Sequence, residues 1–364
     1  MRDVSIIGVG QIPVAEHWDR SIRDLAVEAI AAARQDAGID RVDVLFVGNM
    51  LSGELAGQEN LATLVADAAG LLPIEALKIE AACASGGAAL RAAHLAVGSG
   101  AHDYALVVGV EKMTDYLTDG VTAALALAAD ADYEAAHGIT FAALNALLMR
   151  RYMYEHQARH EDFAPFSVNA HANAALNPHA MYRQPITVDD FERSPWVADP
   201  INILDSAGIC DGAAALLIGP TSETRRARRP PVRIAASATA TDTLGLAERK
   251  DPLVWDVDLF EPHDAFTIVS VLTLEACGLA DRGRALKLAA EGRIGLEGDI
   301  PICTFGGLKG RGHPVGASGV YQLVETVLQL RGEAGPAQVR GATIGMAQSV
   351  GGSGSVAVTH ILQV

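Results

Sequence analysis

Short runs of β-branched residues alternate with amphipathic stretches along this chain, and that alternation restricts the possible folds more than any other feature. In the first unit, residues 4–9 are a predicted strand, and Ser21 with Asp24 forms a predicted capping box at the start of a helix. Apolar residues then repeat at helical spacing, and Gly38 is the predicted C-terminal cap. Residues 44–47 are the next predicted strand. The pattern predicts an α/β fold with buried sheets.

The two ends of the chain repeat one plan of strand, tight turn and helix. In the first half, residues 77–82 lead into Cys83 and then into a helix of small residues. In the second half, residues 300–304 lead into a glycine-rich turn and a helix around Gly316. We therefore predict that the two halves of the protein have similar folds.

A polar segment at about 112–199, rich in His, Asn, Pro and Tyr, lies between these halves. A predicted helix in it places Phe141 and Tyr152 on one apolar face. We expect an N-terminal half at 1–220, with a loop domain at about 112–199 inserted in it, and a C-terminal half at 221–364.

Composition excludes several classes of function. The formal net charge of −16 disfavours nucleic acid as a partner, and no apolar run is long enough to cross a bilayer. The N-terminus lacks the pattern of a secretory signal, so we do not expect export. Four scattered cysteines form neither a disulfide framework nor zinc-type pairs, which predicts a cytoplasmic protein without a metal. The basic run Arg225–Arg229 is interpreted as a solvated linker or helix end.

The first candidate for chemistry is Cys83, at the predicted junction of a strand and a helix. Free backbone N–H groups and the helix dipole at such a junction favour a thiolate, and the small neighbouring residues leave room for a substrate. A lone cysteine can also be merely a small buried residue. We interpret Cys83 as a nucleophile because two further segments support that chemistry.

The glycine-rich segment 306–319 holds His313 directly before Pro314, in a turn where a histidine can act as a base. The other segment contains His263 and Asp264 at the predicted start of a helix. Alone, the first could be a simple turn, and the second could be a helix cap by Asp264 beside a surface histidine.

Together these segments resemble the motifs of the thiolase superfamily, in the same order and over nearly the whole chain. The closest resemblance is to archaeal-type acetyl-CoA acetyltransferases. The matching segments are the nucleophile motif at 80–87, the HDxF motif at 263–266, the GHPxGxxG motif at 312–319 and a structural segment at 211–215. Two further segments, at 111–115 and 348–354, resemble the archaeal-type sequences.

The resemblance implies a five-layer αβαβα sandwich and a loop domain over a coenzyme pocket. It implies an acetyl-CoA C-acetyltransferase, or 3-oxoacyl-CoA thiolase, that uses coenzyme A thioesters as substrates and needs no other cofactor. His313 would take the proton of Cys83, which would then carry the acyl group. Backbone N–H groups at Cys83 and near Gly351 would form the oxyanion hole, and His263 with His313 would stabilise an enolate.

One departure from the family concerns the base that acts on the substrate's α-carbon. Most thiolases use a second cysteine near the C-terminus, and Gln348 stands at that place here. The related HDCF motif has its cysteine where this chain has Ala265. Cys303 is one candidate to replace it, but we favour His263, because histidine exchanges protons near neutral pH.

Two other function classes stay open: a thiolase-like retro-aldol lyase and a non-catalytic acyl-CoA-binding subunit. Retention of Cys83 and both histidines counts against each. The resemblance also implies a homodimer or a dimer of dimers, and a connection to lipid metabolism and the mevalonate pathway. A small OB-fold protein and hydroxymethylglutaryl-CoA synthase are the expected protein partners. Residues that bind the substrate are not identified by the sequence.

Overall fold

The computed structural model describes residues 1–242, 244 and 258–364. The strands are β1 (Val4–Gln11), β2 (Val44–Gly48), β3 (Glu75–Ile79), β4 (Ala105–Glu111), β5 (Trp196–Ala198), β6 (Ile201–Asn202), β7 (Gly212–Pro220), β8 (Val232–Thr241), β9 (Leu259–Glu261), β10 (Ile344–Gly351) and β11 (Val356–Gln363). The helices are α1 (Ile22–Ala37), α2 (Ser52–Leu55), α3 (Leu61–Ala68), α4 (Ser85–Ser99), α5 (Thr118–Leu125), α6 (Phe141–His156), α7 (Ala164–Ala174), α8 (Val188–Arg193), α9 (Thr267–Ala276), α10 (Ala285–Ala290) and α11 (Ser318–Arg331).

Nine strands are hydrogen-bonded in the order β3-β2-β4-β7-β1-β8-β11-β10-β9. The first five belong to one half of the chain and the last four to the other, and a short pairing of β1 with β8 joins them. Each half contains both parallel and antiparallel pairs. In the first half, β2 is parallel to β3 and β4, and β7 is antiparallel to β4 and β1. In the second half, β9 is parallel to β10, and β11 is antiparallel to β10 and β8. The halves therefore share one plan, as predicted.

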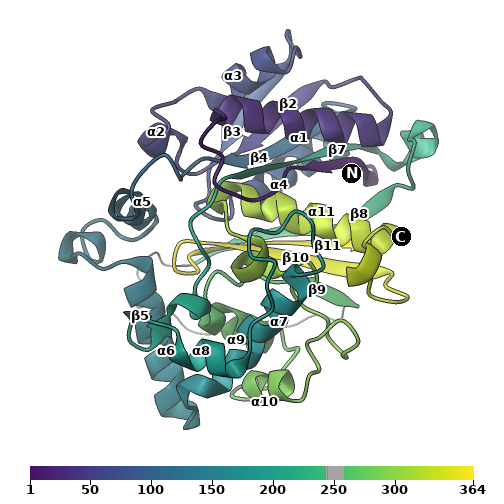
Figure 1. Ribbon diagram of the computed structural model, residues 1–364. Coiled ribbons are helices and arrows are strands. Elements are labelled where there is room, and N and C mark those ends of the chain that lie inside the picture. The colour runs from purple at the N-terminus through teal and green to yellow at the C-terminus, as the bar shows by residue number, and fades with distance from the viewer. Residues whose placement is uncertain (243, 245–257) are drawn as a thin grey trace.

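The halves stack as five layers, which confirms the predicted αβαβα sandwich (Figure 1). Helices α1 and α3 cover the outer face of the first sheet, and α4 and α11 lie between the two sheets, in contact with both. Helix α9, with α6, α7 and α10, covers the outer face of the second sheet. Because α4 follows Cys83 and α11 follows His313, the central layer brings the two predicted motifs together.

Helix α1 shows how local signals produced correct predictions. Ser21 and Asp24 form both hydrogen bonds of the capping box, and Gly38 ends the helix with a left-handed φ of 66°. The predicted apolar face is buried against β1 and the rest of the first sheet. The burial of this face gives the helix most of its stability, since isolated helices of this length are marginal in water.

The predicted strand at residues 300–304 is wrong. Ile302 forms only an isolated parallel bridge with Phe260 of β9, at the edge where a counterpart of β3 would lie. The backbone of Cys303 has a left-handed φ of 51°, which is incompatible with a continuing strand and costs energy for a residue with a Cβ atom. In the second half, a turn therefore lies at this place, and residues 300–304 form no strand.

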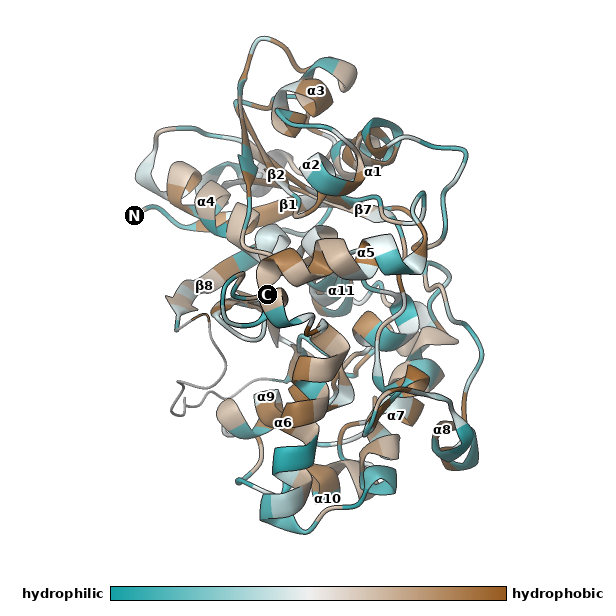
Figure 2. Cartoon of the chain, turned by 90° about the vertical axis from the view of Figure 1, so that its left-hand side faces the viewer, coloured by the Kyte–Doolittle hydropathy of each residue, from teal (hydrophilic) through white to brown (hydrophobic). Residues whose placement is uncertain are grey.

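The segment at about 112–199 contains helices α5 to α8 and the short strand β5. Helices α6 and α7 pack on α9 and α10 in one apolar core, so this segment is joined closely to the second half. In Figure 2, β1, β7 and α9 are mostly brown, whereas α8 at the surface is mostly teal. No helix in the described part of the chain combines the length and apolar character needed to cross a membrane.

Candidate active site

Cys83 lies in a tight loop between β3 and α4, as predicted. Ala82 has a left-handed φ of 49°, an unusual backbone conformation for alanine that turns the chain just before the cysteine. The buried hydroxyl of Ser85 accepts a hydrogen bond from the N–H of Ala81 at 2.9 Å and donates to the carbonyl of Ala82 at 2.6 Å. These bonds hold the strained loop and fix the position of Cys83.

The small residues after Cys83 allow α4 and α11 to approach closely. A Cβ atom on Gly86 would lie 2.9 Å from the carbonyl oxygen of Gly316 and 2.9 Å from the backbone nitrogen of Val320. Any larger side chain would push the two helices apart. The spacing between the Cys83 loop and the His313 loop therefore depends on glycine at this position.

His313 precedes α11, in a buried loop that Gly312 enters with a φ of 114°, a value open mainly to glycine. The Nδ1 atom of His313 lies 2.7 Å from the hydroxyl oxygen of Ser318, in the first turn of α11. Nδ1 is therefore occupied within the protein, which leaves Nε2 for the substrate side.

His263 lies just after β9 and is buried, with 4% of its surface exposed, so the alternative of a surface histidine is wrong. Asp264 does not cap a helix, because α9 begins only at Thr267. Its carboxylate instead pairs with the buried Lys309 at 3.2 Å and accepts a hydrogen bond from the N–H of Leu308. This pair ties the His263 segment to the glycine-rich segment.

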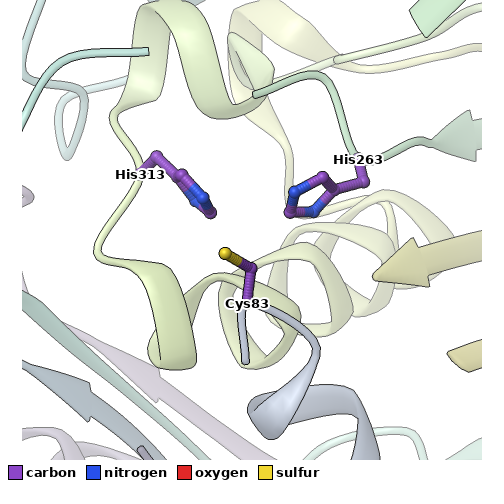
Figure 3. A group of neighbouring side chains, drawn as sticks. All are labelled: Cys83, His263 and His313. Atoms are coloured by element: carbon purple, nitrogen blue, oxygen red, sulfur yellow. The ribbon is translucent and has the colours of Figure 1, made fainter. Parts of the chain in front are cut away.

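The three predicted catalytic residues meet in space, and both imidazole rings face the sulfur of Cys83 (Figure 3). The sulfur and the nearest ring nitrogens of His263 and His313 all lie within 4.8 Å of one another. The two ring centroids are 5.1 Å apart, with an interplanar angle of 81°. These donor atoms could ligate a metal ion, and they equally suit a thiol nucleophile with two neighbouring bases.

The expectation that the loop favours a thiolate at Cys83 is wrong. Burial, together with the nearby carboxyl of Glu111, raises the pKa of the Cys83 thiol to about 12. The N-cap of α4 is Ala84, and the N–H groups of the loop do not outweigh this desolvation. The resting protein therefore holds a neutral thiol, which needs a base at the moment of reaction.

Both histidines are neutral near pH 7. Burial lowers the pKa of His263 to about 4, while the adjacent Asp264 opposes the shift and Arg311 adds to it. Burial, His263 and Arg311 hold the pKa of His313 well below its usual value. Each ring therefore keeps a free electron pair on one nitrogen and can accept a proton.

The trio lies in a cavity of about 630 Å³, a volume typical of small-molecule sites. Apolar side chains from two helices form much of its wall, including Phe141 and Leu148 of α6 and Val269 and Leu272 of α9. The apolar face of α6 that the sequence indicated thus lines the cavity. The cavity residues of α9 were missed, since the sequence alone does not show which face of a buried helix borders an open space.

The structure separates the candidates for the α-carbon base. Gln348 lines the cavity, and its amide donates to the hydroxyl of Thr359 at 3.3 Å. Cys303 is buried and is not among the described residues that line the cavity, and burial with Asp264 and Glu261 raises the pKa of its thiol far above normal. Cys277 also lines the cavity, at the end of α9.

Gly351, the predicted second part of the oxyanion hole, ends β10 beside the nucleophile loop. A Cβ atom at Gly351 would collide with the carbonyl oxygen of Ala81, so the strand end touches the loop that carries Cys83. Glycine is required there for this close approach.

Glu111 is a buried supporting residue whose role the sequence did not show. Its carboxylate accepts hydrogen bonds from the N–H groups of Met50, Leu51 and Gly316, each at 3.0 Å. Burial raises its pKa to about 7. The sequence also did not show the supporting role of Ser318, although this residue lies within the glycine-rich segment 306–319, five residues after His313.

Comparisons with known proteins identify the family and relatives that cover the whole chain. Residues 4–222 match the family described as thiolase, N-terminal domain, and residues 228–364 match the thiolase C-terminal domain-like family. The chain is 43% identical to the acetyl-CoA acetyltransferase of Methanothermobacter thermautotrophicus over 99% of each chain. It is 38% identical to that of Methanocaldococcus jannaschii, over 100% of this chain and 99% of the relative.

Among solved structures, the Ltp2-ChsH2(DUF35) aldolase has the same fold, with a TM-score of 0.83, 24% identity, and coverage of 100% of this chain and 98% of the other. The family matches in both halves of the sequence, the stacked sheets and the relatives along the full chain all indicate the same family. The chain belongs to the thiolase family.

Proposed function

We propose that this protein transfers the acyl group of an acyl-coenzyme A through a thioester on Cys83, as an acetyl-CoA C-acetyltransferase or 3-oxoacyl-CoA thiolase. The observation that carries the proposal is the convergence of one thiol and two neutral imidazoles in a single cavity. The names of the two archaeal relatives support acetyl-coenzyme A as a substrate. The steps require protein groups and coenzyme A thioesters alone.

In the first half-reaction, the Nε2 atom of His313 accepts the proton of Cys83 as the sulfur attacks the thioester carbonyl. A thiol with a pKa of about 12 next to a weakly basic imidazole does not form a stable ion pair beforehand, so proton transfer accompanies bond formation. The carbon–sulfur bond to coenzyme A then breaks. The departing coenzyme A thiolate takes the proton from His313, and the acyl group stays on Cys83.

The oxyanion of this step is bound by backbone N–H groups at Cys83 and Gly351. Support comes from the contact between the end of β10 and the nucleophile loop, which brings the two backbones together. Such preorganised donors commonly contribute about 3 kcal/mol to transition-state stabilisation.

In the second half-reaction, His263 removes a proton from the α-carbon of a second acyl-coenzyme A. The enolate attacks the acyl carbon, the bond to the sulfur of Cys83 breaks, and the Cys83 thiolate takes up the proton held by His263, which restores the neutral thiol. His263 is supported by its place in the trio and by its Nδ1 atom, which is buried without a hydrogen-bond partner among the described residues. Run backward, the same steps are thiolysis of a 3-oxoacyl-coenzyme A.

The test is cleavage of acetoacetyl-coenzyme A by free coenzyme A, with mass spectrometry of the acid-quenched protein. We expect acetyl-coenzyme A as product and an acetyl adduct on the peptide that contains Cys83. Cys83→Ala should show neither, and Cys277→Ala should show both, which controls for the other cavity thiol. Cleavage without any adduct on Cys83 would disprove the covalent route.

A second substrate, a 3-hydroxyacyl-coenzyme A, distinguishes the acyl transferase from the lyase and the binding subunit. A retro-aldol lyase would cleave a 3-hydroxyacyl-coenzyme A without free coenzyme A and would keep this activity in Cys83→Ala. A binding subunit would retain acyl-coenzyme A and turn over neither substrate. The neutral thiol beside two neutral imidazoles favours the acyl transferase, because neither alternative uses a nucleophile.

We propose a homodimer formed through β3. In the described part of the chain this strand pairs only with β2, so its other edge offers free backbone groups. Each of its residues is at least partly exposed, and Leu77 is 46% exposed. Leu77→Lys should shift the sedimentation coefficient from that of a dimer to that of a monomer. An unchanged coefficient would place the interface elsewhere.

We also propose a cytoplasmic location, an OB-fold partner protein and association with hydroxymethylglutaryl-CoA synthase in the mevalonate pathway. The four cysteines are free thiols, which suits a reducing compartment. Co-purification of the tagged protein from its own cells, followed by mass spectrometry, tests both partners. Recovery of the protein without either one would contradict this assembly.

A further inference from the structure

Gln322 of α11 is fully buried, and its side-chain amide contacts three backbone carbonyls from two separate segments. Its Nε2 atom lies 3.0 Å from the carbonyl oxygen of Glu261, 2.8 Å from that of Pro262, and 3.0 Å from that of Gln348. The two N–H bonds of the amide are therefore shared among three acceptors. The Oε1 atom accepts a hydrogen bond from the hydroxyl of Ser349 at 3.0 Å.

The first two of these carbonyls belong to the residues directly before His263. The other contacts lie in β10, just before Gly351. Gln322 also stands one helical turn after Ser318, whose hydroxyl contacts His313. One helix thus holds both catalytic histidines, through Ser318 for one and Gln322 for the other.

We propose that Gln322 is a positioning residue that fixes the His263 imidazole relative to Cys83 during enolate formation. This inference rests on the proposed function, because it assigns Gln322 to the step in which His263 acts. His263 needs such support, since its Nδ1 atom is buried with no hydrogen-bond partner in the part of the chain that the structure describes. Its ring orientation therefore depends on its backbone, and the amide of Gln322 is bonded to the carbonyl of Pro262, in the peptide bond that precedes His263.

Gln329 provides a matched control on the same helix. It is also buried, its amide donates to the carbonyl of Ala337 at 2.7 Å, and its Oε1 accepts from the N–H of Val339 at 2.8 Å. These bonds lie in the loop that follows α11, away from the segments that carry the trio. Loss of either amide should lower stability, but only loss of Gln322 should affect His263.

The experiment compares Gln322→Met and Gln329→Met in the full chain. We expect Gln322→Met to slow exchange of the α-hydrogens of acetyl-coenzyme A in heavy water by about 10- to 100-fold, because small misplacements of a catalytic group have effects of this size. The rate of Cys83 acylation by acetoacetyl-coenzyme A should change by less than about threefold, and KM by less than about twofold. Gln329→Met should leave all three unchanged while lowering the melting temperature.

Ser349→Ala is a milder second variant that keeps the proposal testable should Gln322→Met fail to fold. It removes only the hydroxyl bound to Oε1 of Gln322, and we expect exchange to slow by about threefold, the effect of one lost hydrogen bond. Equal exchange rates in the wild type, Ser349→Ala and any folded Gln322 variant would overturn the positioning role. Absence of a Cys83 adduct in the wild type would instead overturn the proposed function.

Discussion

The Nδ1 atom of His313 lies 2.7 Å from the hydroxyl oxygen of Ser318, and this contact leaves the opposite ring nitrogen facing the thiol of Cys83. When His313 accepts a proton on Nε2, Nδ1 must carry the other hydrogen and donate it to Ser318. In that tautomer the hydroxyl of Ser318 accepts the Nδ1 hydrogen and orients the ring so that Nε2 faces the thiol. In the proposed acylation the same hydroxyl would accept the Nδ1 hydrogen of the imidazolium.

Ser318→Ala should slow acylation of Cys83 by about 3- to 10-fold, because one buried hydrogen bond that orients the base is lost. Rapid-quench mass spectrometry with acetoacetyl-coenzyme A measures this rate. Ser270→Ala is the control, since its hydroxyl is buried without a hydrogen-bond partner among the described residues and should be dispensable. An unchanged acylation rate in Ser318→Ala would show that His313 is oriented by other contacts.

The alkylation rate of Cys83 by iodoacetamide should rise about tenfold per pH unit from pH 7 to pH 10, without a plateau. The reason is that burial and Glu111 raise the pKa of the thiol to about 12, so the thiolate fraction keeps growing over this range. Peptide mapping identifies the labelled cysteine, and acyl-coenzyme A should protect Cys83. A plateau below pH 9 would mean that the resting protein already holds a thiolate.

His263→Asn should abolish α-hydrogen exchange of acetyl-coenzyme A and leave acylation of Cys83 largely intact. Asparagine can donate a hydrogen bond but cannot accept the α-proton. Cys303→Ala should change the exchange rate little, because its sulfur is buried outside the described cavity wall. Mass spectrometry after incubation in heavy water measures exchange. The reverse pattern would assign the base to Cys303.

His360 predicts a pH dependence of stability. Its Nε2 atom lies 3.0 Å from the carbonyl of Gly87, and burial lowers its pKa to about 4, with the Gly87 contact opposing the shift. Below about pH 6.5 the His360 imidazole is protonated in the unfolded chain but stays neutral in the folded protein. The free energy of unfolding therefore falls as the pH drops from 6.5 toward 4. Below pH 4 both states are protonated and the loss is complete.

The free energy of unfolding of the wild type, minus that of His360→Gln, should therefore be about 2 kcal/mol smaller at pH 5 than at pH 7. Denaturant unfolding at both pH values measures it. The difference between the two proteins isolates this histidine from the buried carboxyls Glu111 and Glu261, whose raised pKa values act in the opposite direction. A difference that does not vary with pH would contradict the lowered pKa.

Local signals were sufficient for much of the fold and for the identity of the trio. The caps of α1 depend on contacts between residues three or four positions apart, so Ser21 and Gly38 could be assigned correctly. The family motifs identified Cys83, His263 and His313 because each segment carries its own loop geometry with it. The left-handed backbone of Cys303, which ends the predicted strand at 300–304, has no comparable local signal.

The sequence by itself indicated the α/β layering, because periodicity and capping act over short stretches of chain. Its motifs also indicated the three side chains that meet in the cavity. Only the tertiary structure decided the neutral state of Cys83 and the contacts of Gln322 with Pro262 and Gln348. Burial and electrostatic interactions sum over groups that are distant in sequence, so the pKa of a thiol depends on everything packed around it. The folded central layer, where α4 meets α11, brings those groups together.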